Sequence, residues 1–277
     1  EAIELFEQVL AEYERVLGSD HPDTLTVRNN LAGAYDSAGR LAEAIDAWKE
    51  LLPDCQRILG ADHPDTLAVR NNLAVAYYSV GRFGEAVELF EQVLAERKRL
   101  LGSDHPDTLN TRNNLAVAYD SVGRFAEAVD AWEELLPDCQ RVLGADHPDT
   151  LAVRNNLAHA YDSVGRFGEA IELFERVLAE QERVLGPDHP DTLVARNNLA
   201  GAYDSVGRFG EAIELYERVL GPDHPDTLTT RHNLAFAYHS AGHFDEAIEL
   251  YERVLADRVR VLGPDHPDTL ATCNNLA

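Results

Sequence analysis

The sequence predicts an all-α solenoid built from repeated pairs of antiparallel helices. The hexapeptide DHPDTL recurs seven times, beginning at Asp20, Asp62, Asp104, Asp146, Asp188, Asp223 and Asp265. The spacing is 42 residues, except for 35 residues between the fifth and sixth copies. Two helical patterns separated by glycines alternate within each repeat, and no segment shows strand alternation. Repeats of this length bury their apolar faces by stacking on their neighbours, which predicts a continuous array.

We predict that residues 1–277 form a single repeat array without a linker. It opens with an unpaired second helix over residues 1–20 and closes with a truncated first helix over residues 266–277. Between them lie six helix-pair units, at residues 21–62, 63–104, 105–146, 147–188, 189–223 and 224–265.

The first helix of a unit is predicted to begin at the proline of DHPD. In residues 21–62, the fixed φ and missing N–H of Pro22 suit the first helical position, and His21 precedes it as the cap. A competing register uses Asp20 as the cap, but His21 precedes a proline and therefore resists helical angles. Two apolar stripes, one containing Leu31 and the other Ala32, predict packing on two sides. The helix is expected to stop at Gly39.

The second helix of the same unit is predicted from about Leu41 to Leu59. Its apolar residues form one stripe, and Gly60 then fits the left-handed cap position. That stripe consists of Leu41, Ala44, Ile45, Trp48, Leu52, Cys55 and Leu59.

The units differ from one another in two predicted ways. Pro53 and Pro137 stand in the second helices of alternate units, where we expect kinks and a higher-order period of 84 residues. The unit from His189 to Asp223 lacks seven residues, so its second helix should be short.

The charge and composition exclude several classes of partner. The formal charge is −25, which repels phosphate backbones and anionic lipids, so we expect neither nucleic acid nor a membrane as a partner. No run of about 18 apolar residues and no signal-peptide pattern is present. With three cysteines, an odd number, the chain is expected to be cytoplasmic. Because it lacks methionine and opens in mid-pattern, we expect it to be an excerpt of a longer product.

The pattern of large and small residues resembles the tetratricopeptide repeat. Leu31, Ala32, Tyr35 and Gly39 match its spacing, and so does the stripe of the second helix. The phrases NNLA, GRF, EA and LGPDHPDTL are similar to the 42-residue variant found in kinesin light chains and in bacterial signalling proteins. The resemblance covers essentially the whole chain and implies a right-handed superhelix whose first helices form a concave, peptide-binding surface.

The chain departs from the family at the first-helix tryptophan and at the closing proline of the second helix. Arginine replaces that tryptophan, and we expect each arginine to reach a glutamate of an adjacent helix, although it could instead bind an acidic ligand. These arginines are Arg28, Arg70, Arg112, Arg154, Arg196 and Arg231.

The resemblance places two columns of polar residues on the concave surface. The first is expected to bind a peptide backbone through its amides and consists of Asn29, Asn71, Asn113, Asn155, Asn197 and His232. The second consists of Asn30, Asn72, Asn114, Asn156, Asn198 and Asn233. The alternative for either column is a structural ladder of hydrogen bonds between neighbouring repeats.

Residues that vary between units on the same surface are candidates for specificity, although drift would produce the same variation. One such position includes His159 and Phe236, and another carries mostly aspartate, which favours a partner with Lys or Arg. This second position holds Asp36, Tyr78, Asp120, Asp162, Asp204 and His239. A solvated acidic face is the simpler explanation of the aspartates.

Catalytic and metal-binding motifs are not predicted. The histidines of DHPD are expected to cap helices rather than bind zinc, and His232, His239 and His243 are a weaker metal candidate because Gly242 interrupts their helix. Cys55 and Cys139 fall on apolar stripes and should be inert. No phosphate loop or nucleophile motif appears, so we expect neither an enzyme nor a cofactor.

Two functions follow from these observations. The first is a protein-interaction scaffold that binds a peptide or partner segment on the concave surface, as part of a larger bacterial signalling protein. The alternative is a self-associating solenoid, in which the open terminal half-repeats join head-to-tail as a homo-oligomer.

Overall fold

The computed structural model describes residues 2–276, and all regular secondary structure in that range is helical. The predicted all-α class is therefore confirmed for these residues. The fourteen helices are α1 (Ala2–Leu17), α2 (Pro22–Ser37), α3 (Leu41–Ile58), α4 (Pro64–Ser79), α5 (Phe83–Leu101), α6 (Pro106–Ser121), α7 (Phe125–Val142), α8 (Pro148–Ser163), α9 (Phe167–Leu185), α10 (Pro190–Ser205), α11 (Phe209–Val219), α12 (Pro225–Ser240), α13 (Phe244–Val261) and α14 (Pro267–Leu276). Glu1 and Ala277, which belong to the predicted terminal helices, lie outside the described residues.

The first helices begin where the proline rule places them. His21 has an extended backbone, and its Nδ1 accepts a hydrogen bond from the backbone N–H of Asp23 at 3.2 Å. Pro22 occupies the first helical position, so the register with His21 as cap is confirmed. The other members of DHPDT have roles that the sequence did not reveal: Thr24 donates to the carbonyl of Gly18 at 2.8 Å, and Asp20 accepts from Arg57 at 2.9 Å.

Glycines end both kinds of helix. Gly39 and Gly60 have φ values of +73° and +104°, in the left-handed region that an L-residue with a side chain seldom adopts. α3 and α7 continue through Pro53 and Pro137, and the bend expected there stays a prediction. The second helix of the shortened unit, α11, has 11 residues against 19 in α9, which confirms that prediction.

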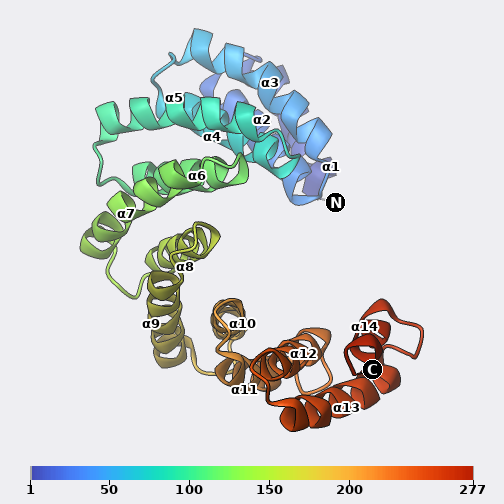
Figure 1. Cartoon of the computed structure of the whole chain (residues 1–277). Helices are drawn as coiled ribbons and strands as arrows, with labels where there is room; N and C mark the ends of the chain where they lie inside the picture. Colours follow the sequence, from blue (N-terminus) through green and yellow to red (C-terminus); the bar gives the residue numbers. More distant parts are fainter. Residues whose placement is uncertain (1, 277) are drawn as a thin grey trace. The chain divides into compact units, whose positions relative to one another are not determined.

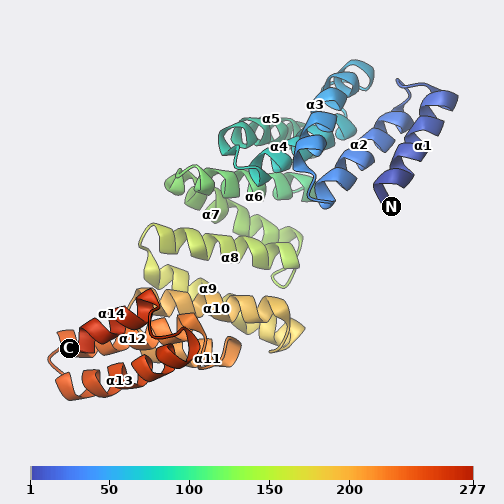
Figure 2. The ribbon, with the colours of Figure 1, turned by 90° about the vertical axis from the view of Figure 1, so that its right-hand side faces the viewer.

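The chain divides into two compact units, residues 1–153 and residues 154–277, with the boundary inside α8. In the first unit, consecutive helices pack on each other, and the first helix α4 also contacts the first helices α2 and α6 (Figure 1). In the second unit, which Figure 2 shows with its last three helices together, α13 contacts both α12 and α14. The prediction of a single array across this boundary stays a prediction.

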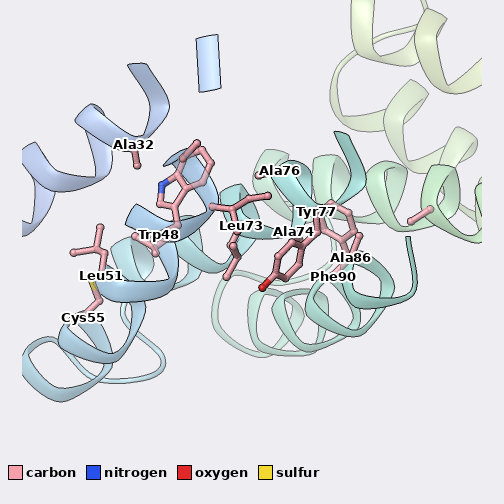
Figure 3. Packing of buried hydrophobic residues seen from close by; sticks show 14 of the residues in the cluster. Ala32, Trp48, Leu51, Cys55, Leu73, Ala74, Ala76, Tyr77, Ala86 and Phe90 are labelled. Carbon is pink, nitrogen blue, oxygen red and sulfur yellow. The ribbon is translucent and has the colours of Figure 1, made fainter. Parts of the chain in front are cut away.

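The core of the first unit is a set of thin layers between helix pairs. One layer contains Trp48, Leu51 and Cys55 of α3, and the next layer contains Tyr77 and Phe90 (Figure 3). Leu51 is fully buried, although the predicted apolar stripe did not include it. Leu52, which the stripe did include, is half-buried. The buried face is wider than expected because α3 packs on both α2 and α4.

Candidate peptide-binding face

The two predicted columns of asparagines lie on the first helices and are mostly half-buried. All six residues of the first column have intermediate exposure, and in the second column only Asn30 is exposed. Partial burial restricts a carboxamide to a few partners, so the contacts of each amide decide which of its groups can meet a ligand.

In the first unit, two first-column asparagines are held by tryptophans of the following helix. Trp48 Nε1 donates to Asn29 Oδ1 at 2.8 Å, and Trp132 Nε1 donates to Asn113 Oδ1 at 2.9 Å. The indole N–H is a donor only. The carbonyl of each amide must therefore face the tryptophan, and the NH₂ group points the other way.

Hydrogen bonds between neighbouring repeats also join the two columns. Asn72 Nδ2 donates to Asn29 Oδ1 at 3.3 Å in the first unit, and Asn198 Nδ2 donates to Asn155 Oδ1 at 3.0 Å in the second. His232 Nε2 lies 3.1 Å from Nδ2 of Asn275. The structural ladder that the sequence left open is thus present at these three steps. At Asn29 and Asn155 it uses the carbonyl oxygen of the side chain.

Two first-column asparagines have a buried carbonyl without a hydrogen-bond partner among the described residues, namely Asn71 and Asn197. The residue nineteen positions after Asn71 is Phe90, which has no N–H to offer. Asn114, the next ladder residue, donates instead to Asn110 Oδ1 at 3.1 Å. One variable residue, Asn110, therefore diverts the ladder away from Asn71.

His232 is the histidine of the first column and lies half-buried in the second unit. Its ring meets the ring of Tyr251 edge-on at 5.2 Å, and its Nδ1 lies 3.3 Å from Thr272 Oγ1. Burial lowers the pKa of the imidazole below its usual range; the nearby Arg258 lowers it further, while Asp268 partly opposes the shift. The ring is therefore a neutral hydrogen-bonding group at neutral pH.

The variable residues present different chemistry in each repeat. Phe236 is 57% exposed, and His159 is exposed with its ring edge-on to Phe174. Tyr78 packs on Phe83, and its hydroxyl accepts from Ser121 at 3.1 Å. His239 is exposed and packs on the ring of Phe244.

The predicted aspartate column is half-buried rather than fully solvated. Asp36, Asp120, Asp162 and Asp204 all have intermediate exposure. One carboxylate oxygen of Asp162 and one of Asp204 are buried without a hydrogen-bond partner among the described residues. Carboxylates that are partly removed from water interact more strongly with an approaching cation than solvated ones do.

An open groove of about 710 Å³ lies beside these columns in the first unit. Its polar lining comes from both columns, through Asn29, Asn30 and Asn72, and Gly33 leaves room between them. Its apolar lining comes mainly from Ile3 and Phe6 of α1. An apolar surface with a few converging amides is the usual composition of a recognition site.

The first-helix arginines are tied into the fold, as the structural interpretation predicted. Arg28 donates to Asp54 at 2.8 Å and Arg112 to Asp138 at 2.7 Å, and Arg154 pairs with Glu180. Arg196 and Arg231 likewise reach carboxylates of neighbouring second helices. Arg70 is buried, and no carboxylate pairs with it among the described residues.

Within residues 2–276, no group of three or more His, Cys, Asp or Glu side chains is placed to hold a metal ion. The DHPD histidines accept backbone N–H groups, as at His63 and His105, which confirms their capping role. His232 contacts Thr272 and Asn275, whereas His243 lies 3.5 Å from Glu246. None of the described helices is both long enough and apolar enough to cross a membrane.

Stacked helix pairs, in which a proline begins each first helix and a glycine follows each helix end, define a helical repeat protein. This class is typical of protein-interaction scaffolds and is generally non-catalytic. The chain belongs to the tetratricopeptide repeat family. One family model with that description matches residues 1–53, 121–180 and 163–220, and a second matches residues 66–107 and 227–268. Proteins of this family bind protein partners.

Curated relatives include Protein KINESIN LIGHT CHAIN-RELATED 3 and Protein KINESIN LIGHT CHAIN-RELATED 2 of Arabidopsis thaliana. Each is 54% identical over 41 residues, which is 15% of this chain and 6% of the relative. The chain therefore matches only a small part of the length of these relatives.

Solved structures share the fold. One solved structure is described as the nearly identical TPR-like repeats of a kinesin light chain from Podosopora anserina. It is 39% identical to this chain, with a TM-score of 0.57 over 72% of this chain and 97% of that one. BtubC (BKLC) from P. vanneervenii is 23% identical, with a TM-score of 0.58 over 82% of this chain and 94% of that one. A signal transduction ATPase from Pyrococcus horikoshii with a tetratricopeptide repeat sensor is 13% identical, with a TM-score of 0.63 over 99% of this chain and 40% of that one. The last two show the fold alone.

Proposed function

We propose that this chain is a scaffold that binds an extended peptide segment of a partner protein on the first-helix face. The observation that carries the proposal is the groove lined by Asn29, Asn30 and Asn72 beside the apolar residues of α1. Amides bind a peptide backbone whatever its sequence, and apolar walls hold its side chains. Residues of the first unit that vary between repeats, such as Tyr78, would then select among sequences.

The partner segment in this proposal is basic. The net charge of −25 provides long-range attraction, and the half-buried aspartates, with Asp36 nearest the groove residues in sequence, provide short-range contacts. Charge complementarity of this kind mainly raises the association rate and excludes acidic competitors. Binding should therefore weaken as the salt concentration rises.

We test the proposal with an array of acetylated and amidated nonapeptides, randomised in sequence and divided into sets of net charge +3 and −3. The purified chain should retain basic peptides and reject acidic ones. Asn29→Ala should weaken the retained peptides about 3- to 10-fold, the value of one or two hydrogen bonds.

The matched control removes an exposed amide outside the face. Gln56 lies on α3 and is exposed, so Gln56→Ala should leave every affinity unchanged. The proposal fails if no peptide is retained, or if Asn29→Ala and Gln56→Ala bind the retained peptides alike.

The wider setting of the scaffold is also part of the proposal. We place it in the cytoplasm, within a larger bacterial signalling protein, on the sequence resemblance alone. Recovery of the complete reading frame tests this placement, which would be abandoned if the frame encoded an export signal or no further domain.

Self-association is a second candidate, supported by the open apolar face of α1. None of the residues of α1 is buried, and Leu5 is 61% exposed. A contact between this face and a different face of a second copy would be head-to-tail and would not close. Sedimentation at rising concentration should then show growing oligomers that Leu5→Lys abolishes, and a monomer at every concentration would exclude the idea.

A further inference from the structure

The two tryptophans of the chain occupy the same position in alternate repeats, and both donate a hydrogen bond to an asparagine of the candidate site. Trp48 and Trp132 are 3% and 2% exposed and stand nineteen residues after Asn29 and Asn113. In the repeat between them, the equivalent residue is Phe90, which is 1% exposed. Phenylalanine therefore fills the same core space, so packing alone does not require an indole there.

What distinguishes the indole is its N–H group, which fixes the orientation of an amide. Asn29 Oδ1 accepts from Trp48 Nε1 and from Asn72 Nδ2, at 2.8 and 3.3 Å. A carbonyl oxygen has two lone pairs, so both are occupied. Asn29 Nδ2 has no partner among the described residues and lines the groove, where it can only donate.

We infer that Trp48 is a positioning residue of the peptide site, which holds the Asn29 amide so that it donates to a backbone carbonyl of the bound segment. This inference rests on the proposed function and names the group that the site recognises. Trp132 makes the equivalent bond to Asn113. Asn71, for which Phe90 takes the sequence position of the tryptophan, lacks this control because its buried carbonyl has no donor.

In the first unit, the donor-fixed amides of Asn29 and Asn113 therefore stand on either side of Asn71, whose carbonyl has no donor. A ligand carbonyl that meets Asn29 finds the donor already in place, whereas at Asn71 the ligand must select one of two orientations. Preorganisation of this kind strengthens binding without a new contact to the ligand.

The first test needs no ligand. In ¹H–¹⁵N spectra of the free chain, the Asn29 side-chain amide should give one narrow pair of signals, which broaden or double in Trp48→Phe. An Asn29 pair that is unchanged in Trp48→Phe overturns the positioning role, whether or not any peptide binds.

The second test uses the basic nonapeptides retained by the chain. Trp48→Phe should weaken them about 3- to 10-fold, and Asn29→Ala combined with Trp48→Phe should be no weaker than Asn29→Ala alone. A tryptophan that acts only through packing would give independent, multiplicative losses, and that result contradicts the inference.

The third test is a gain of function, which misfolding cannot imitate. Phe90→Trp should supply the missing donor to Asn71 and tighten the same peptides about 3-fold, and Asn71→Ala should cancel the gain. An unchanged or weaker affinity in Phe90→Trp, with the thermal unfolding temperature preserved, counts against the inference. Positioning confirmed by the spectra with no peptide retained would instead refute the proposed function alone.

Discussion

The guanidinium of Arg97 donates to the hydroxyl of Thr111 at 2.7 Å, inside the seam between α5 and α6. It also donates to the carbonyl of Asp107 at 3.0 Å, and the side chain is only 8% exposed. In the preceding repeat the same two places are taken by Cys55 and Val69, which are both buried. The seam thus has a polar form and an apolar form, and each pairs matching residues from neighbouring repeats.

This pairing predicts strong coupling between Arg97 and Thr111. Thr111→Val leaves a buried guanidinium with fewer acceptors, and Arg97→Cys leaves a cavity beside a hydroxyl, so each should cost about 1–3 kcal/mol. The double variant recreates the Cys55 and Val69 seam and should recover about 1–2 kcal/mol of the summed loss. Urea unfolding of the four proteins measures the coupling, and strictly additive losses would show that the two forms are not separate solutions.

Acidification should destabilise the second unit through His232. Because burial lowers the imidazole pKa in the folded chain, protonation favours the unfolded chain, whose pKa is near 6.5. The stability that the neutral ring contributes is therefore complete above that pH and is lost as the pH falls toward the lowered folded value. Hydrogen exchange of α12 and α13 amides at pH 7.5 and pH 5.5 measures the effect.

The control for this prediction restores the residue of the other repeats. His232→Asn should reduce the loss of protection on acidification, whereas His239→Asn, at an exposed position, should not. The capping histidines are unchanged in all three proteins, so the difference belongs to His232. Equal pH dependence in His232→Asn and the parent would refute the assignment.

Glycine to alanine substitutions should act in opposite directions at two positions. Gly84 lies in the first turn of α5 with open space around its Cβ position, and Ala126 stands there in α7. Gly84→Ala should therefore stabilise the chain by about 0.5 kcal/mol. Gly39 has φ at +73°, so Gly39→Ala should cost about 1 kcal/mol. Thermal unfolding measures both changes in stability. A shift of the unfolding temperature in the same direction in both variants would contradict the backbone argument.

The three thiols should differ sharply in reactivity. Burial raises the pKa of Cys139 to about 11, and Cys55 is shifted in the same direction for the same reason. Cys273 is exposed. A thiol reagent at pH 8 should modify Cys273 rapidly and the other two only on unfolding. Rapid labelling of Cys139 in the native chain would mean that α7 opens far more often than its packing indicates.

Much of the local structure could be predicted because it depends on residues close in sequence. Pro22 fixes its own φ and lacks an N–H, so it could only start α2, and His21 was available to cap it. Gly39 and Gly60 marked the ends of α2 and α3 because few other residues adopt their backbone angles. The 42-residue recurrence of DHPDTL then repeated these boundaries along the chain.

The side-chain pairings of the candidate site could not be predicted in the same way. Asn29 and Asn71 stand in the same segment, VRNNLA, yet one carbonyl is fully paired and the other is buried without a partner. The difference arises from Trp48 against Phe90 on the following helix and from Asn72 against Asn114 on the next repeat. No periodicity within one helix contains that information.

The sequence by itself determined the fold class, the approximate helix boundaries and the position of the asparagines on the first helices. The tertiary structure decided which amide group each asparagine can offer and which buried polar residues pair across a seam. The physical reason is distance along the chain: backbone angles are set by immediate neighbours, whereas a hydrogen bond such as that between Trp48 and Asn29 exists only after two helices have packed in register.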